Sequence, residues 1–518
     1  MQAVRPITKR PGSGEPGRQS LYDTPAKASK LSIVDAVEER QQVDPADGWV
    51  VTTLAEVCNF NPRSTDRVPA DEELVTFVPM AAVDAELGQI TQAEIRAARG
   101  LKRGYTRFQN GDVLFAKITP CMENGKAAVA SDLAGGIGFG STEFHVFRPG
   151  PEIMPEWIYY FVRQQWFRDM ARDNFSGTAG QRRVPTSFLE HTEIPLPPLE
   201  EQRRIVGVLK GVLGEIREAR EALARVPGNV KRFRRAVLAA AFRGHLTAEW
   251  RDQNAPKIQA AAEACDKLTA STPPNSPTAS DVLEYIPGDR LLVHFHGTGT
   301  LGQLYDGDLE DLPESWTWAK ASALAALEPR AITDGPFGSN LKTEHYVENG
   351  PRVIRLQNIG DGVFNDVHSH ISDQHFETLR RHEVFAGDIV IGALGDPLPR
   401  ACLIPPVGLA IVKADCIRLK PNAAMVCSAY VCFAINSDQT RSWAIAQVHG
   451  VGRTRLNLEN IRRMPVPLAP IAEQREIVRR IEEAFAEADS AEASAATATE
   501  YLRRLEQSTL QSAFRGEL

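Results

Sequence analysis

The sequence predicts α/β to α+β domains in a pseudo-twofold internal repeat: two such domains separated by two long helices that pack as an antiparallel coiled coil. Three observations predict this fold class. A proline-led phrase recurs 272 residues further along the chain. Each copy of the phrase opens a run of apolar residues at the three-and-four spacing of a helix. Ahead of each copy lie short β-rich segments interrupted by helical patterns.

The repeat is long and free of gaps. PLPPLEEQRRIV, Pro195–Val206, returns as PLAPIAEQREIV, Pro467–Val478, with eight of the twelve positions identical. AFRGHL, Ala241–Leu246, returns as AFRGEL, Ala513–Leu518, at the same offset. About 65 residues therefore align without a gap, whereas the segments upstream match only loosely. Such a pattern indicates two variable domains, each followed by a constant segment.

Length and composition set the class of protein. A chain of 518 residues has room for two to four domains. Seven scattered cysteines without a CxxC pair are typical of a reducing compartment, and we expect a cytoplasmic protein without a secretory signal or membrane span. The net charge is −7, so any contact with nucleic acid must come from local basic patches or a basic partner.

The domain organisation follows from the repeat. We expect a mobile extension over residues 1–47, with a short helix at 31–41, and a connector over 247–312 whose STPPNSPTAS stretch is a loop. The other parts are a first variable domain at 48–198, a central spacer helix region at 199–246, a second variable domain at 313–470 and a C-terminal spacer helix at 471–518.

The constant segments are predicted to be long helices. Pro198 suits a helix start, and Glu200 and Glu201 favour its positive end. Pro227-Gly228 should kink or break the first helix, where the second copy has Thr499-Glu500. A single apolar stripe can also belong to a helix packed on its own domain, but two copies favour a coiled coil. The residues predicted for this coil and for docking of partners are Ile205, Leu209, Val212, Ile216, Leu223, Ile477, Ile481, Phe485, Leu502 and Phe514.

Within the domains, VLFAKI, FHVFRP, DIVIGA and VIRLQNI are predicted strands, and Pro155–Arg172 is a predicted helix. Three motifs invite a catalytic or metal-binding interpretation: GIGFG at Gly136, DGPF at Asp334 and HSHISDQH at His368. The first lacks a following helix, the second stands without a nucleotide-binding half, and the third has no completing ligand set. We therefore expect no catalytic, cofactor-binding or metal-binding residues in this chain.

Other polar residues suit DNA. Arginine fits guanine edges, Asn and Gln fit adenine edges, and Lys, Ser and Thr fit phosphates. For each of these polar residues taken alone, the alternative is an ordinary solvated surface position. Arg183 and Arg455 are favoured as DNA-binding residues because they are equivalent in the repeat. The predicted DNA-binding residues are Lys117, Thr119, Lys126, Ser141, Thr142, Gln181, Arg182, Arg183, Ser339, Asn340, Lys342, Arg355, Gln357, Asn358, Arg453 and Arg455.

The two helix starts, the AFRG helix ends, LPESW at Leu312, KITPCMENGKAAV, GIGFGSTEFHVFRP and RLQNIG together resemble the specificity (S) subunits of type I restriction–modification systems. The resemblance extends over nearly all of 48–518. It implies a non-catalytic subunit whose two domains each read one half of a split site in double-stranded DNA. It also implies two methyltransferase (modification) subunits docked on the helices, together with restriction subunits. S-adenosylmethionine, ATP and Mg would then belong to the partner subunits.

Two other classes stay open at this point. One is a restriction enzyme with its own chemistry fused in the chain, against which the lack of a complete nucleotide-binding or nuclease motif counts. The other is a coiled-coil protein-interaction scaffold without sequence-specific DNA binding.

Overall fold

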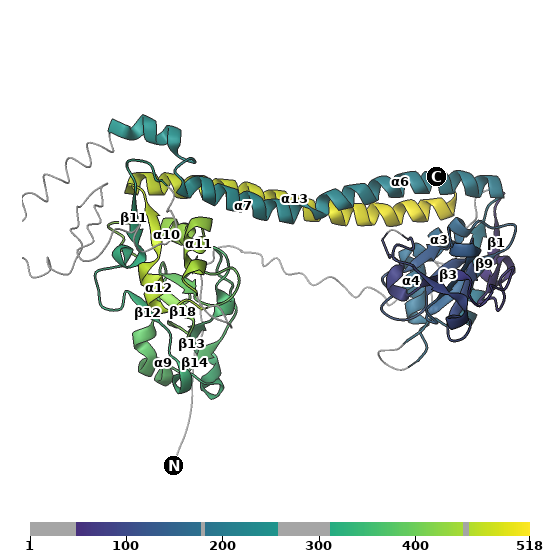
Figure 1. Cartoon of the computed structure of the whole chain (residues 1–518), viewed down its shortest axis with the longest axis horizontal. Coiled ribbons are helices and arrows are strands. Elements are labelled where there is room, and N and C mark those ends of the chain that lie inside the picture. Colours follow the sequence, from purple (N-terminus) through teal and green to yellow (C-terminus); the bar gives the residue numbers. More distant parts are fainter. Residues whose placement is uncertain (1–47, 87, 178–181, 257–310, 449–454) are drawn as a thin grey trace, which may run out of the picture. The chain divides into compact units, whose positions relative to one another are not determined.

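The computed structural model describes residues 48–86, 88–177, 182–256, 311–448 and 455–518 (Figure 1). The expected N-terminal extension, its short helix and the STPPNSPTAS loop lie outside the described residues. The described chain forms two compact units. Unit 1 runs to Glu218 and resumes with Leu502–Leu518, and unit 2 is Ala219–Tyr501. None of the helices in the described ranges is both long and apolar enough to cross a membrane.

Unit 1 is built on antiparallel strands, with one parallel pair between β3 and β8. One four-stranded sheet has the order β2-β9-β6-β7, a second has the order β4-β3-β8-β5, and β1 pairs with β10. The strands are β1 (Val50–Thr53), β2 (Cys58–Phe60), β3 (Leu74–Val78), β4 (Glu94–Ala97), β5 (Thr106–Gln109), β6 (Val113–Ala116), β7 (Ala127–Val129), β8 (Ile137–Gly140), β9 (Phe144–Pro149) and β10 (Glu193–Leu196). The helices of the domain are α2 (Leu54–Val57), α3 (Pro155–Arg163), α4 (Gln165–Asp173) and α5 (Thr186–Glu190), with 3-10 turns η1 (Met80–Ala82), η2 (Ala98–Gly100) and η3 (Ala134–Gly136).

Unit 2 repeats this plan with different lengths. Its sheets have the orders β12-β18-β15-β16 and β14-β13-β17, and β11 pairs with β19. The strands are β11 (Thr317–Lys320), β12 (Ile332–Asp334), β13 (Tyr346–Ile354), β14 (His370–Ile371), β15 (Ile389–Gly392), β16 (Arg400–Leu403), β17 (Ala410–Val412), β18 (Cys416–Leu419) and β19 (Pro465–Leu468). The helices are α9 (Asp373–Leu379), α10 (Ser428–Ile435), α11 (Asp438–Ala446) and α12 (Leu458–Arg463), with 3-10 turns η5 (Ala321–Leu324), η6 (Gly338–Asn340), η7 (Thr343–His345), η8 (Leu356–Asn358) and η9 (Arg380–His382).

Most predicted elements are confirmed. VLFAKI, FHVFRP and DIVIGA supply β6, β9 and β15. VIRLQNI is a strand only as far as Ile354, after which η8 begins. The helix expected over 155–172 is two helices, because Gln164 is extended and buried between them. The Gln164 side chain accepts a hydrogen bond from the Trp166 indole at 2.8 Å, which holds this corner in place.

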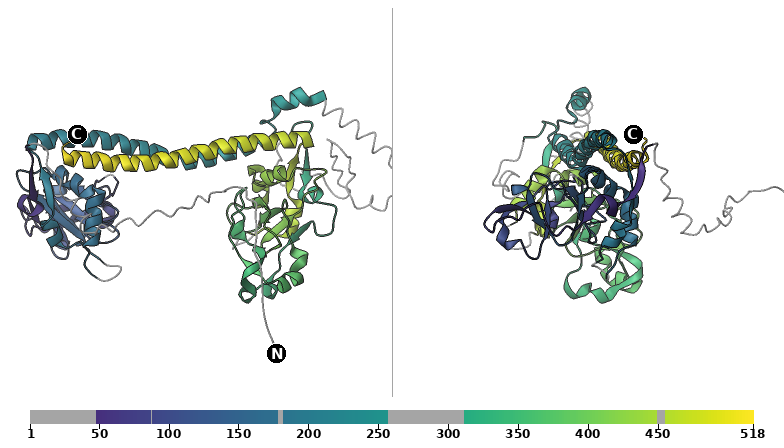
Figure 2. Two further views of the ribbon diagram at one scale, coloured as in Figure 1. Left: turned by 180° about the vertical axis from the view of Figure 1, so that it is seen from behind. Right: turned by 90° about the vertical axis from the view of Figure 1, so that its right-hand side faces the viewer.

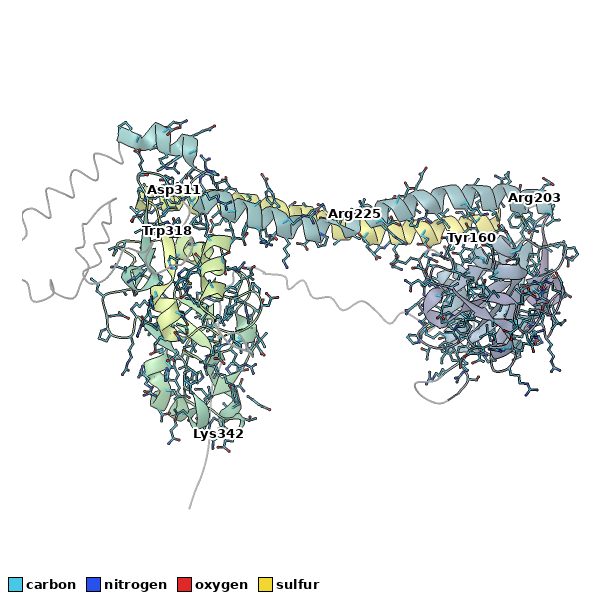
Figure 3. All side chains as sticks on the ribbon, in the orientation of Figure 1. Tyr160, Arg203, Arg225, Asp311, Trp318 and Lys342 are labelled. Carbon is cyan, nitrogen blue, oxygen red and sulfur yellow. The ribbon has the colours of Figure 1, made fainter. Side chains whose placement is uncertain are left out.

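The long helices are α6 (Leu199–Ala224), α7 (Val226–Phe242) and α13 (Ile471–Arg515). The predicted break is confirmed: α6 ends before Arg225 (Figure 3), and Pro227 lies in the first turn of α7, whereas α13 is continuous. In unit 1, Ile205 and Leu209 share one hydrophobic core with Phe514, so the start of α6 packs on the end of α13.

In unit 2, Phe242 at the end of α7 shares a core with Ile477 and Ile481 at the start of α13. The helices therefore pair in opposite directions in both units, as predicted. Figure 2 shows α7 alongside the first part of α13.

The repeated glutamine of the EQR phrase fastens each long helix to its domain. The fully buried Gln202 accepts a hydrogen bond from the Met154 N–H, the residue before α3, at 2.8 Å. Its amide donates to the carbonyls of Glu152 and Pro197 at 2.9 and 2.8 Å. One side chain thus satisfies three backbone groups, of which the Pro197 carbonyl lies in a buried site and the other two are partly buried.

Gln474, its equivalent in unit 2, makes the same set of bonds. It accepts from the Cys427 N–H before α10 at 2.9 Å, and it donates to the carbonyls of Met425 and Ala469 at 3.3 and 2.8 Å. The repeated phrase therefore encodes the same set of glutamine hydrogen bonds in both units.

An aromatic residue completes each anchor. Trp157 of α3 donates its indole N–H to the Pro195 carbonyl at 2.9 Å, and Tyr430 of α10 donates its hydroxyl to the Pro467 carbonyl at 2.8 Å. The AFRG phenylalanines cover these rings: Phe514 lies 4.2 Å from Trp157 and Phe242 lies 5.3 Å from Tyr430, between ring centroids. Each domain therefore receives the AFRG end of the helix that follows the other domain.

Replacing Gln202 by Leu should lower the stability of unit 1 by about 2 kcal/mol or more, because the Pro197 carbonyl in a buried site and two partly buried backbone groups lose their partner. The measurement is urea unfolding with hydrogen exchange read at the amides of α3. Arg203→Leu, at the exposed neighbouring position, is the matched control. Equal stability of the two variants would contradict the anchoring role.

His145 of β9 makes unit 1 sensitive to acid. Its ring is buried, one ring nitrogen lies 2.8 Å from the Val184 carbonyl and the other lies 3.1 Å from the Asn61 amide nitrogen, an arrangement that requires the neutral ring. Burial lowers its pKa from 6.5 to about 4.

Because the unfolded chain binds this proton more readily, unit 1 should lose stability as the pH falls from 6.5 towards 4, by up to about 3 kcal/mol. Urea unfolding at pH 7 and pH 5 measures the loss. The variant His145→Gln should show a flatter profile over the same interval. An unchanged pH profile in that variant would exclude His145 as the cause.

Candidate nucleic-acid interface

In unit 1, Arg183 is held beside the start of β9. Its Nε and Nη2 donate to the two carboxylate oxygens of Glu143, both at 2.8 Å. The backbone around it is also fixed, because the Val184 N–H donates to the Lys117 carbonyl and the Lys117 N–H to the Glu143 carbonyl, each at 2.9 Å. Three separate chain segments thus meet at one ion pair.

The same construction stands in unit 2, at the 272-residue offset. The Nε of Arg455 lies 2.7 Å from Oδ1 of Asp415, which is the counterpart of Glu143 and directly precedes β18. The Leu456 N–H donates to the Ala393 carbonyl, and the Ala393 N–H to the Asp415 carbonyl, each at 2.9 Å. The two arginines that the repeat favours therefore occupy equivalent structural positions.

These ion pairs orient the arginines without burying them. The side chains of Arg183 and Arg455 are 38% and 45% exposed, so the guanidinium groups remain accessible to a ligand. The hydrogen bond to Arg183 is the main cause that lowers the pKa of Glu143, and the carboxylate in turn raises the pKa of Arg183. An arginine oriented in this way can present its outer N–H groups to a base edge or a phosphate.

Each site carries one further lysine, from a different segment. Lys117 in unit 1 stands where unit 2 has Ala393, and Lys413 in unit 2 stands where unit 1 has Ser141. Burial is the main cause that lowers the pKa of Lys117. The Lys413 ammonium lies 5.5 Å from the Tyr346 ring. The arginine–carboxylate ion pair is therefore common to both units, while the lysine beside it comes from a different segment in each.

The unit 2 site adds aromatic rings. The Arg455 guanidinium lies 4.9 Å from the ring of Phe337, which is 43% exposed. Arg355 lies 6.0 Å from the Tyr346 ring, on the side of the site where Lys413 also lies. Such basic groups interleaved with rings suit a nucleic-acid surface.

The other predicted DNA-binding residues have mixed surroundings. The Thr119 hydroxyl donates to Glu123 at 2.7 Å, the Lys126 ammonium donates to the Met80 carbonyl at 3.0 Å, and the Ser141 hydroxyl accepts from the Glu143 N–H at 3.2 Å. Thr142, Arg182, Asn340, Lys342 and Gln357 are exposed. Lys342 lies at the end of the second domain that is remote from α7 and α13 (Figure 3). Gln181, Arg453 and the side chain of Ser339 lie outside the described residues.

The prediction is wrong for Asn358. Its side chain is fully buried, and its amide donates to the carbonyls of Asn365 and Val367, both at 2.8 Å. Its oxygen accepts from the Arg355 N–H at 2.9 Å. Every polar group of Asn358 therefore serves its own backbone, and none remains for a base.

The prediction that the apolar stripe of the long helices also docks partner subunits needs correction. Ile205, Leu209, Ile477, Ile481 and Phe514 are buried in the cores of the two units, so they cannot meet a partner subunit. The large apolar side chains that the long helices do expose are Val208, Phe233 and Tyr501, at 38%, 44% and 65%.

Sequence reasoning missed a basic hollow of about 580 Å³ in unit 2. Arg330, Arg381 and Arg462 line it, together with Asp334 of the DGPF turn and Glu328, which pairs with Lys420 at 2.8 Å. Each arginine stands in a short polar stretch, EPR, RRH or IRR, and only the fold brings the three together.

The buried His382 positions one of these arginines. Its Nε2 accepts a hydrogen bond from Arg381 Nε at 2.9 Å, and its Nδ1 lies 2.5 Å from the Asp334 carbonyl. The ring must be neutral to accept from an arginine, and burial is the main cause that lowers the pKa of His382. The hollow therefore presents an oriented guanidinium, which suits an anionic group such as phosphate.

Comparison with known proteins gives one consistent result. Residues 46–223 match the family model for the type I restriction modification DNA specificity domain. The specificity subunit of the type I restriction enzyme EcoEI, from Escherichia coli, is 26% identical over 481 residues, which are 86% of this chain and 79% of that protein. The EcoAI specificity subunit, also from Escherichia coli, is 29% identical over 403 residues, 68% of this chain and 63% of that protein.

Solved structures share the fold. A chain from a study of complex assembly and conformational transition in the type I R-M system aligns with a TM-score of 0.63, at 18% identity, over 92% of this chain and all of that one. The HsdS subunit from Thermoanaerobacter tengcongensis aligns with a TM-score of 0.51, also at 18% identity, over 92% and 98% of the two chains. Residues 46–223 thus match a DNA specificity domain, and most of the chain is similar to the specificity subunits of type I restriction–modification systems.

Proposed function

We propose that this chain recognises a two-part DNA site, one part through each domain, and that it carries no chemistry of its own. The observation that carries the proposal is the duplicated ion-pair site. Arg183 with Glu143 and Arg455 with Asp415 stand at equivalent positions in two domains whose surrounding residues differ. An arginine held at the same position in both domains, with different residues around it, would let the two domains bind half-sites of different sequence.

The dimensions of the helices agree with this proposal. Half-sites read from one face of B-DNA lie roughly 34–36 Å apart. A helix of 45 residues, the length of α13, is about 68 Å long. The helix pair is therefore long enough to serve as a spacer for such a site.

The exposed polar side chains and the hollow are assigned different roles in DNA binding. Arg182, Arg183, Gln357 and Arg455 are exposed or partly exposed and suit base edges or phosphates. The hollow lined by Arg381 and Arg462 suits a backbone phosphate. Since the chain as a whole has a charge of −7, basic partner subunits would complete the binding surface.

The partners follow from the same proposal. Methylation of a base inside a duplex requires base flipping and a cofactor pocket, which we assign to two modification subunits that bind S-adenosylmethionine. ATP and Mg are assigned to restriction subunits. Val208, Phe233 and Tyr501, the exposed apolar residues of the long helices, are the proposed contacts for the modification subunits.

The test of this function is to purify the chain with its modification subunit and to map methylated bases across DNA. A single split motif is expected. Residues 54–190 are then exchanged for those of the EcoEI relative, with Met154, Trp157 and Arg163 retained so that the helix anchor survives. One half of the motif should change and the other half should stay.

The matched control exchanges residues 321–463 with Cys427, Tyr430 and Asp438 retained, and it should change the opposite half. If a stable complex leaves DNA unmethylated, or if either exchange alters both halves, the assignment of one domain to each half-site is wrong.

The hollow in unit 2 has its own test. Replacing Arg381 and Arg462 by Ala should weaken binding to duplexes of any sequence. The slope of log affinity against log salt should fall by about two, one for each phosphate that an arginine no longer neutralises. Arg203→Ala with Arg217→Ala, on α6, removes the same charge elsewhere. A salt slope equal to that of this control would exclude phosphate binding at the hollow.

A further inference from the structure

The two helix-docking contacts share their apolar residues. Leu510, Ala513 and Phe514 in unit 1 correspond to Leu238, Ala241 and Phe242 in unit 2, and all six are buried. These three positions therefore do not distinguish residues 230–246 from residues 502–518. The two segments differ at the buried Val237, whose counterpart is Thr509, and at several charged positions.

The polar positions differ at the centre of the contact. In unit 1, Arg163 at the end of α3 pairs with Glu506 of α13 at 2.8 Å, and their side chains are only 13% and 9% exposed. The equivalent of Glu506 on the other helix is Arg234. That residue pairs with Asp489 of α13 and lies over the Phe485 ring.

The second polar position is neutral in unit 1 and carries an ion pair in unit 2. Gln507 of α13 accepts a hydrogen bond from the Gln165 N–H in unit 1 at 2.7 Å. The counterparts in unit 2 are Arg235 and Asp438, which form an ion pair at 3.1 Å. In unit 1 the domain supplies the cation, Arg163, and the helix end supplies the anion. In unit 2 the domain supplies the anion, Asp438, and the helix end supplies the cation.

An exchange of the helix ends would bring like charges together. With 230–246 on the first domain, Arg234 would stand beside the buried Arg163, close to Arg168, whose pKa burial lowers. With 502–518 on the second domain, Asp438 would lose Arg235 and face Glu506 and Gln507. Like charges around the buried Arg163 would be strongly destabilising, whereas the effect at the more exposed Asp438 would be weaker.

We propose that charge decides which helix end each domain accepts. The first domain accepts 502–518 and rejects 230–246, and the second domain does the reverse. The pairing of unlike halves is then specified by the chain's own contacts, independently of DNA recognition. The buried pair between Arg163 and Glu506 carries most of the discrimination, because the pair between Arg235 and Asp438 is 61% and 42% exposed.

The test uses the full chain and a charge-reversal cycle. Glu506→Arg introduces the residue that the other helix end carries at this position. Amide exchange in the last turns of α13 should become roughly a hundredfold faster, because a buried ion pair is replaced by two like charges. Arg163→Glu alone should have a similar effect. The double variant, with both charges reversed, should return to within about tenfold of the original chain.

The matched control is Glu487→Arg, which makes the same charge change at an exposed position of α13 and should leave exchange in 502–515 unaltered. The proposal is overturned if Glu506→Arg leaves exchange unaltered. It is also overturned if the double variant is no better protected than the single ones, since the contact would then depend on packing and not on charge. Failure of DNA recognition in the split-motif test would leave this result unaffected.

Discussion

The structure depends on one constraint, the complete satisfaction of a buried glutamine at the start of each long helix. The buried side chains of Gln202 and Gln474 each bond to a backbone N–H that precedes a domain helix and to two carbonyls. A rigid joint results, because an amide in such a site tolerates only one arrangement of its three partners. The aromatic layer of Trp157 or Tyr430 lies on this joint, and the AFRG phenylalanine lies on that layer.

Symmetry in the apolar contacts is combined with asymmetry in the polar ones. Glu473 is fully buried and accepts hydrogen bonds from Thr247, Arg251 and Trp316 at 2.7 to 2.9 Å, so it ties the segment after α7 and the start of the second domain to α13. Its counterpart Glu201 is partly exposed and pairs with Arg204 within the same helix. Apolar packing is non-directional and can be copied, whereas buried charges demand particular partners. The two copies of the helix, α6 and α13, thus have different attachments at their first turns.

The repeat made the fold predictable, and tertiary contacts decided what the repeat could not. The break before Pro227, the strands β6, β9 and β15, and the antiparallel helix pair all follow from local pattern or from the offset. The corner at Gln164 did not, because its extended backbone depends on burial and on the Trp166 indole. Asn358 was misassigned for a related reason: polar residues on an irregular segment often bond to their own backbone, and the sequence contains no sign of it. The hollow around Arg381 assembles segments more than a hundred residues apart.

The ion-paired state of Arg183 and Arg455 changes how DNA contacts at these positions should be probed. Reversing either charge would set an acid against Glu143 or Asp415 and disturb the strands they precede, so loss of binding would not isolate a DNA contact. Neutral replacements that keep the hydrogen-bonding reach, such as Arg183→Gln, separate the two effects, because Glu143 retains a donor nearby. An arginine held by an acid is also oriented before its ligand arrives, so less side-chain entropy is lost on binding than for a mobile lysine. A subunit with a net negative charge can therefore bind DNA through a few oriented arginines, provided that their carboxylate partners leave the outer N–H groups exposed.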